Sequence, residues 1–208
     1  PSAASATPEL YRIINDNNDR STQLDAIVTL AQIGVGGEEL LPGLLQQMWE
    51  AKDPFNKRKL LYAISSFGDA ARPAIPEILA LLSHEDGTVR SFAALALARL
   101  DCPRETIIPA LLKMLQESDP GSRIMAASCL VHYVPPDDAT VRALILALQD
   151  SQNDVRSHAV DSLGDFGEYA RPALPALMLT ALQDTSTGLG SAAYDAIKQI
   201  EYRMPGRE

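Results

Sequence analysis

Two stretches of this sequence decide its fold: FGDAARPAIPEILALL, residues 67–82, and FGEYARPALPALMLTAL, residues 166–182. They begin 99 residues apart, which is three periods of 33. Stepping through the chain by that period aligns a proline column with one arginine in it: Pro8, Pro42, Pro76, Pro109, Arg142 and Pro175. It also aligns a mostly basic column: Gln23, Lys57, Arg90, Arg123, Arg156 and Gly190. A unit of this length that recurs six times indicates a repeat architecture.

Apolar residues recur at fixed distances from both columns. They stand two, three and six places after the proline column, and three, seven and ten places after the basic column. Each spacing marks one face of an α-helix. Each repeat is therefore predicted to hold two amphipathic helices, an outer one that begins near the proline and an inner one after the basic column. The column three places after the basic one holds Ala126 and Ala159, which we expect to be fully buried.

The residues between the predicted helices agree with this division. Asp53-Pro54 and Asp119-Pro120 are typical of an N-cap followed by proline at the first helical position. The column prolines are expected in the first helical turn, where the amide has no intrahelical partner. Glycines such as Gly34 follow the inner helices, where a left-handed cap favours them. Twelve helices are expected, in antiparallel pairs, with breaks near Asn18, Lys52, Glu85, Ser118, Ser151 and Thr185.

The predicted fold class is all-α, a right-handed α-α superhelix of six helical hairpins. Small side chains in one column are expected to let neighbouring hairpins approach closely. This column stands six places after the basic one and holds Thr29, Ala63, Ala96, Cys129, Ser162 and Ala196. One hairpin cannot bury its apolar stripes, but stacked neighbours can. We expect a single domain over residues 1–208, with repeats at about 7–36, 37–69, 70–102, 103–135, 136–168 and 169–204.

The inner-helix motif resembles that of a known family. The pattern D-x-x-x-x-V-R-x-x-A-x-x-x-L occurs as Asp150, Val155, Arg156, Ala159 and Leu163. It resembles the HEAT repeat, in the short bacterial form of phycobilisome-lyase-like HEAT proteins. The resemblance covers nearly the whole chain and implies a scaffold that binds protein. It also implies a ladder of Asp–Arg pairs between repeats, although the acidic column is acidic only in repeats four to six, at Glu117, Asp150 and Asp184.

The sequence offers little for catalysis. Three histidines, at 84, 132 and 158, are too few and too scattered for a multi-histidine iron centre, so no metal site is expected. Cys129 falls in the small-residue column, and Cys102 is predicted to be a partly exposed thiol in a turn, with nothing beside it to activate it. No phosphate-binding glycine loop or nucleophile elbow is present. We predict no enzyme activity, no catalytic residue and no cofactor.

Charge and hydropathy narrow the choice of partners. The net charge is −9, the wrong sign for a nucleic acid partner, and no apolar run approaches the ~20 residues of a membrane span. The basic cluster Lys57-Arg58-Lys59 is interpreted as the solvated start of a helix. Residence in the cytoplasm is expected, and the periplasm is compatible. The sequence opens on Pro1 without a methionine, which suggests a domain excised from a larger chain or complex.

The inner helices of a solenoid line its concave side, the usual binding surface. A helical wheel places the solvent-facing columns one, five and eight places after the basic column. Repeats one to four fill these columns, with two flanking positions, mostly with apolar residues: Leu24, Val28, Tyr62, Phe92, Leu95, Ile124, Met125 and Val131. Repeats five and six are polar there, and Asp161 and Asp195 form a predicted acidic rim. Either a partner binds this strip, or tight curvature or a neighbouring domain covers it.

The predicted function is therefore a non-enzymatic scaffold that binds a partner peptide or helix on its concave face. The alternative is a bilin lyase-like chaperone for a tetrapyrrole chromophore, which the repeat style suggests although no motif marks a chromophore pocket.

Overall fold

The computed structural model describes residues 6–16, 19–183 and 188–202, and these residues form helices, turns and loops with no strand. The chain divides into two compact units, Pro1–Pro103 and Arg104–Glu208, and each is described by itself. The predicted all-α class is confirmed. That the six repeats form a single domain stays a prediction.

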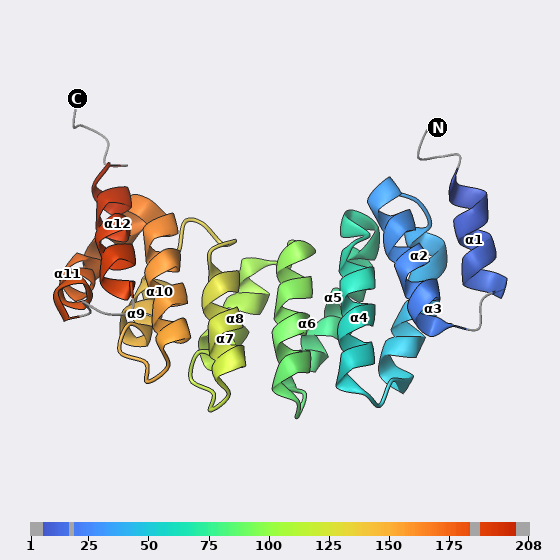
Figure 1. Ribbon diagram of the computed structural model, residues 1–208, viewed down its shortest axis with the longest axis horizontal. Coiled ribbons are helices and arrows are strands. Elements are labelled where there is room, and N and C mark those ends of the chain that lie inside the picture. The colour runs from blue at the N-terminus through green and yellow to red at the C-terminus, as the bar shows by residue number, and fades with distance from the viewer. Residues whose placement is uncertain (1–5, 17–18, 184–187, 203–208) are drawn as a thin grey trace. The chain divides into compact units, whose positions relative to one another are not determined.

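The first unit contains three helical hairpins (Figure 1). Its helices are, in chain order, α1 (Thr7–Asp16), α2 (Arg20–Ile33), α3 (Gly37–Glu50), α4 (Pro54–Ser65), the 3-10 helix η2 (Gly68–Ala74), α5 (Ile75–Ala80), the 3-10 helix η3 (Leu81–Ser83) and α6 (Gly87–Arg99). The inner helices α2, α4 and α6 pack side by side, each against an outer helix of its own hairpin.

The second unit repeats this plan. Its helices are α7 (Arg104–Met114), α8 (Pro120–Leu130), α9 (Asp138–Ala147), α10 (Asn153–Phe166), the 3-10 helix η4 (Gly167–Ala173), α11 (Leu174–Gln183) and α12 (Leu189–Tyr202). The inner helices are α8, α10 and α12. The predicted breaks near Lys52, Glu85, Ser118 and Ser151 are confirmed, and those near Asn18 and Thr185 lie outside the described residues.

The predicted helix starts are correct in part. Asp53 and Asp119 cap their helices through hydrogen bonds that their carboxylates accept from backbone amides. Pro76 and Pro175 are the second residues of their helices, as predicted. The first-turn prediction is wrong for Pro42 and Pro109, each the sixth residue of its helix. Both rings are exposed, so water can hydrate the carbonyl that loses its amide partner.

The two stretches that revealed the repeat also share a local structure. Residues 67–82 and 166–182 each contain Arg-Pro-Ala-X-Pro, and in each a seven-residue 3-10 helix precedes the α-helix. Two prolines three residues apart remove two amide donors and so interrupt the α-helical hydrogen-bond ladder, and the α-helix begins only one residue before the second proline. Gly68 and Gly167 open these segments with positive φ angles of 55° and 57°.

The core follows the predicted inner-helix column. Ala126 and Ala159 are 0% exposed, as expected. In the second unit, close approach of neighbouring hairpins depends on the predicted small column. The Ser162 hydroxyl in α10 donates to the carbonyl oxygen of Ala127 in α8 at 3.0 Å. A Cβ added at Gly164 in α10 would lie 3.2 Å from the Cα of Ala196 in α12.

This close approach corrects the predicted wheel. Columns one and eight were expected to face solvent, but several of their residues are buried: Leu24, Ala31, Ser65, Ser91, Ala98 and Gly164. In the described residues the exposed face instead follows columns two, five and nine, none of whose members is buried. The physical reason is that an inner helix packs against the inner helices of neighbouring hairpins as well as against its own outer helix, which rotates the free face by about one residue.

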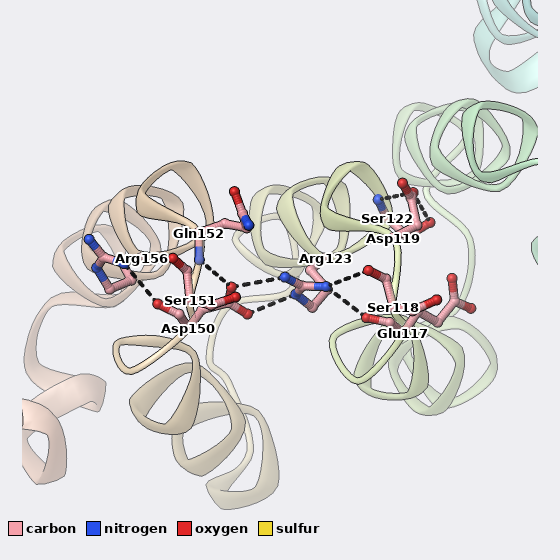
Figure 2. Close-up of polar contacts among 9 residues, drawn as sticks. All are labelled: Glu117, Ser118, Asp119, Ser122, Arg123, Asp150, Ser151, Gln152 and Arg156. Carbon is pink, nitrogen blue, oxygen red and sulfur yellow. Dashed lines mark hydrogen bonds and ion pairs between the residues drawn. The ribbon is translucent and has the colours of Figure 1, made fainter.

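In the second unit, the two arginines of the basic column tie an inner helix to the turn that follows its outer helix. Arg123 donates from Nη1 to the carbonyl oxygens of Glu117 and Ser118, at 2.8 and 3.0 Å (Figure 2). Arg156 binds the carbonyls of Asp150 and Ser151 in the same way. Carbonyls in such a turn have no partner within a helix, so a long donor from the next helix satisfies them.

One rung of the predicted Asp–Arg ladder is present in the second unit. Arg123 donates from Nε and Nη2 to the two carboxylate oxygens of Asp150 in the next hairpin, at 2.7 and 2.9 Å (Figure 2). This ion pair holds the pKa of Asp150 below its ordinary value, chiefly through the Arg123 hydrogen bond. The next acidic member, Asp184, lies outside the described residues.

Replacing Ala159 by leucine is expected to destabilise the protein by about 1–3 kcal/mol, because the added carbons have no room beside a fully buried position. The matched control is Ala139→Leu, an exposed position in the first turn of α9. Denaturant unfolding followed by circular dichroism measures both variants. Equal midpoints for Ala159→Leu and the parent would contradict the assigned core face.

Candidate functional site

A cleft of about 380 Å³ lies on the inner helices of the first unit. Its lining comes from α2, α4 and α6: Leu24, Asp25, Val28, Thr29, Gln32, Arg58, Lys59, Tyr62 and Phe92. Four of the predicted strip residues are thus brought together: Leu24, Val28, Tyr62 and Phe92. The volume falls within the usual range of ligand pockets, roughly 300–1,000 Å³.

The four residues differ in their exposure. Tyr62 is 40% exposed, and Val28 and Phe92 are half-buried. The prediction that Leu24 faces solvent is wrong, because only 3% of its surface is exposed. Leu24 belongs to column one, which packs toward the neighbouring hairpin, so it contributes to the cleft wall from a mostly covered position. The cleft lining therefore combines covered and half-buried apolar side chains with an exposed tyrosine and with polar and charged residues.

Aromatic rings hold one arginine in the cleft lining, Arg58, and a second, Arg99, beside the lining residue Tyr62. The guanidinium carbon of Arg58 lies 4.5 Å from the ring centroid of Phe55 and 5.3 Å from that of Phe92. The guanidinium carbon of Arg99 lies 4.9 Å from the ring centroid of Tyr62. Among the described residues no carboxylate pairs with either arginine. A guanidinium stacked on a ring keeps its N–H edge available for a carboxylate.

Lys57-Arg58-Lys59 lie near the start of α4, as predicted, but the interpretation that they are solvated is wrong for Lys57. Lys57 is 7% exposed and donates to the carbonyl oxygen of Met48 at 2.7 Å, so it closes the end of α3. Burial lowers the pKa of its ammonium group. Lys59 donates to the Ser21 hydroxyl at 2.7 Å and lies over the Phe55 ring. Three consecutive basic residues therefore have three different structural environments.

The other predicted strip residues do not line this cleft. Leu95 is half-buried on α6, one turn after Phe92. Ile124, Met125 and Val131 belong to the second unit, where they are half-buried on α8 and at its C-terminal cap. Their role in binding stays a prediction.

The predicted acidic rim lines a cleft of about 470 Å³ in the second unit, between α10 and α12. Asp161 and Asp195 are exposed there and are joined by Asp165. Asp195 accepts a hydrogen bond from Lys198 at 3.1 Å. In the described ranges no group of three histidine, cysteine or carboxylate side chains could hold a metal ion. The carboxylates line one cleft, and their predicted role as an acidic rim that orients a partner stays a prediction.

The cysteines offer no accessible thiol. Cys129 is 1% exposed, and burial raises its pKa to about 12. The prediction of a partly exposed Cys102 is wrong, because it too is 1% exposed and its pKa is raised by burial. Its amide donates to the Leu97 carbonyl, which draws the turn back over the end of α6. A protonated, covered thiol is a weak nucleophile.

Sequence reasoning missed Phe55 and Arg99 at this surface. Arg99 is in column nine, which the predicted wheel placed off the exposed face, and Phe55 precedes the basic column in the first turn of α4. The available signal was the proximity of Phe55 to Arg58, since residues three apart on a helix are neighbours. In the described part of the chain, no helix is both long and apolar enough to cross a membrane.

Comparison with solved structures shows the same fold in proteins of low sequence identity. A designed armadillo repeat protein in complex with the peptide (KR)4 is similar, with a TM-score of 0.61 and 18% identity over 93% of this chain and 99% of that one. The complex of CpcE and CpcF of phycocyanin lyase from Nostoc sp. PCC7120 matches with a TM-score of 0.59 and 18% identity, over 76% of this chain and 97% of that one. Kap121p matches with a TM-score of 0.70 and 18% identity. The match covers 95% of this chain and 24% of the Kap121p chain.

Sequence comparison identifies the repeat itself. No curated protein matches the chain. The family model of HEAT repeats matches it at residues 55–127, 75–141 and 108–198, which together extend over most of the chain. These matches include the inner-helix motif around Asp150 and Arg156 and five of the six members of the basic column. The chain therefore belongs to the HEAT repeat family.

Proposed function

We propose that this protein is a non-enzymatic scaffold that binds a segment of a partner protein in the cleft of its first unit. The observation that carries the proposal is the cleft itself, whose lining includes apolar side chains, an exposed tyrosine and the ring-stacked Arg58, with Arg99 stacked on that tyrosine. Large aromatic residues and arginine are the side chains that most often anchor protein interfaces. The similar armadillo repeat protein in complex with (KR)4 supports a peptide as the kind of partner.

The chemistry of the cleft favours one kind of segment. An apolar side chain in the cleft would contact Val28 and Phe92, and a nearby carboxylate could bind the N–H edge of Arg58 or of Arg99. Asp25 is the one carboxylate among the lining residues. We therefore propose a short peptide or helix with an apolar anchor beside aspartate or glutamate.

A display library of random peptides, selected on the intact protein, tests this proposal. Two single variants with opposite expected effects on affinity then show whether the selected peptides bind in this cleft. Arg58→Gln is expected to weaken the selected peptides about tenfold, the value of one lost charge-assisted bond. Asp25→Asn is expected to strengthen them, because it removes a carboxylate that repels the peptide. Peptides that bind both variants as they bind the parent would show that the cleft is not the site.

The tetrapyrrole chaperone remains the second candidate, since an anionic conjugated ligand would also suit a cleft with aromatic and basic walls. The similarity to the CpcE and CpcF complex concerns the fold. Co-expression with bilin synthesis, followed by a visible absorbance spectrum of the purified protein, separates the candidates. A bilin band that Tyr62→Ala removes would favour the chaperone over the peptide scaffold.

A further inference from the structure

A second cleft of the first unit, of about 700 Å³, shares no lining residue with the cleft between the inner helices. Its lining includes Lys57 from α4 and His84 from the turn before α6, and we name it the turn cleft. His84 stands 27 residues after Lys57, as Asp150 stands 27 residues after Arg123. Lys57 and His84 are therefore the first-unit equivalents of the ion pair in the second unit (Figure 2).

The Lys57 ammonium group lacks the carboxylate partner that Arg123 has. Lys57 is 7% exposed, and in the described part of the chain no carboxylate forms an ion pair with it. Asp150 raises the pKa of Arg123, chiefly through a side-chain hydrogen bond, whereas burial lowers the pKa of Lys57. An ammonium group has three N–H donors, and the Met48 carbonyl accepts one of them. Lys57 is therefore a covered cation with donors left for an anion.

The imidazole of His84 offers a second donor to the turn cleft. Its Nδ1 accepts a hydrogen bond from the Asp86 amide at 3.1 Å, so the ring proton lies on Nε2. Within the described ranges, Nε2 has no hydrogen-bond partner. Lys52 also lines the cleft, where it is exposed and adds a second positive charge. The turn cleft thus combines two ammonium groups with an imidazole N–H.

Two carboxylates line the turn cleft as well, but neither takes the role of Asp150. Asp86 caps α6, and its carboxylate accepts hydrogen bonds from two backbone amides of that helix at 2.8 and 3.2 Å. Glu85 is exposed and forms no ion pair with any described residue. These two charges weaken the attraction for an anion, but they leave the donors of Lys57 and His84 unoccupied.

We propose that the turn cleft binds a carboxylate group between Lys57 and His84, so that a ligand supplies the charge that Asp150 supplies in the second unit. A carboxylate is the acceptor that the repeat itself uses at this position, since both oxygens of Asp150 accept from Arg123. One ligand oxygen accepts from the ammonium group and the other from the imidazole N–H. The group comes either from a small organic acid or from an acidic side chain of a partner protein.

Titration of the isotope-labelled intact protein with acetate, followed by NMR at neutral pH and low ionic strength, tests the proposal. The amide resonances of Ala51, Glu85 and Asp86 should shift and saturate in the millimolar range, the affinity expected of two hydrogen bonds in an open cleft. Sodium chloride at equal ionic strength should not reproduce these shifts. A blocked tripeptide with a central aspartate forms the second arm. Tighter binding of acetate than of the tripeptide supports a small acid as the source, and the reverse order supports a partner's side chain.

His84→Asp is the sharpest variant, because it places a carboxylate of the chain itself beside Lys57. Acetate binding should weaken at least about tenfold, because the donor is lost and the site becomes occupied. The urea midpoint of the first unit should rise, since Lys57 gains a counter-charge. Glu85→Gln should instead tighten acetate binding roughly twofold, because it removes an exposed, solvent-screened negative charge.

His132→Asp, an exposed position in the second unit, is the matched control and should bind acetate as the parent does. A parent without saturable shifts, shifts that chloride reproduces, or a His84→Asp variant that binds acetate like the parent would each overturn the proposal. None of these outcomes depends on whether the cleft between the inner helices binds a peptide.

Discussion

Replacing Arg123 by alanine should destabilise the protein by about 3 kcal/mol, the largest loss we expect from one surface-proximal side chain. Arg123 makes two hydrogen bonds to the Asp150 carboxylate and two to backbone carbonyls in the turn after the preceding outer helix. The side chains of Arg123 and Asp150 are only 11% and 14% exposed. Truncation therefore leaves a mostly covered carboxylate and two turn carbonyls without the hydrogen bonds that Arg123 donates.

Urea unfolding of the intact chain measures this loss, with Arg142→Ala, an exposed position on α9, as the control. Since the chain has two compact units, the transition of the second unit is to be followed separately, for example by hydrogen exchange in α8 and α10. A midpoint for Arg123→Ala within error of the control would show that the ion pair contributes nothing.

The same pair predicts a pH dependence. The pKa of Asp150 is lower in the folded protein than its ordinary value, because Arg123 stabilises the carboxylate. The unfolded chain therefore binds this proton more readily, so the contribution to stability is full above the ordinary pKa near 4 and is lost as pH falls through the folded value. Asp150→Asn should remove this acid-dependent part of the stability while keeping the shape of the side chain.

Replacing Tyr62 by alanine should weaken binding of a cleft-selected peptide by about 30-fold, or ~2 kcal/mol, the cost of truncating an aromatic anchor. The change removes an exposed ring from the cleft wall and also frees Arg99, which lies over that ring. The helical fold should persist because Tyr62 belongs to no core column. Tyr169→Ala, an exposed tyrosine on η4, is the control. Calorimetric titration of the two variants compares them directly, and equal affinities would remove Tyr62 from the site.

The sequence predicted the interior better than the surface. The columns three and seven places after the basic one place Ala159 and Leu163 in the core, because a 33-residue period repeated six times leaves little freedom in helical register. The caps at Asp53 and Asp119 follow from local chemistry. These features depend on contacts within one hairpin, which one repeat already specifies.

The errors arise from contacts between elements. Leu24 and Ala31 are buried because a neighbouring hairpin covers columns that a single-helix wheel leaves free. Cys102 is buried because its turn folds back on α6. The arrangement of Arg99 over Tyr62 joins residues 37 positions apart on two inner helices, and no pattern within one repeat specifies it. The candidate site depends on such contacts and was therefore found only in part.

Amide hydrogen exchange with and without a selected peptide tests the central claim, that the cleft of the first unit is where a partner binds. Bound peptide should slow exchange in α2, α4 and α6, around Val28, Tyr62 and Phe92, because binding there suppresses local opening of these helices. Exchange in α10 and α12 should stay the same. Protection confined to α10 and α12, beside Asp161 and Asp195, or to the outer helices would contradict the account.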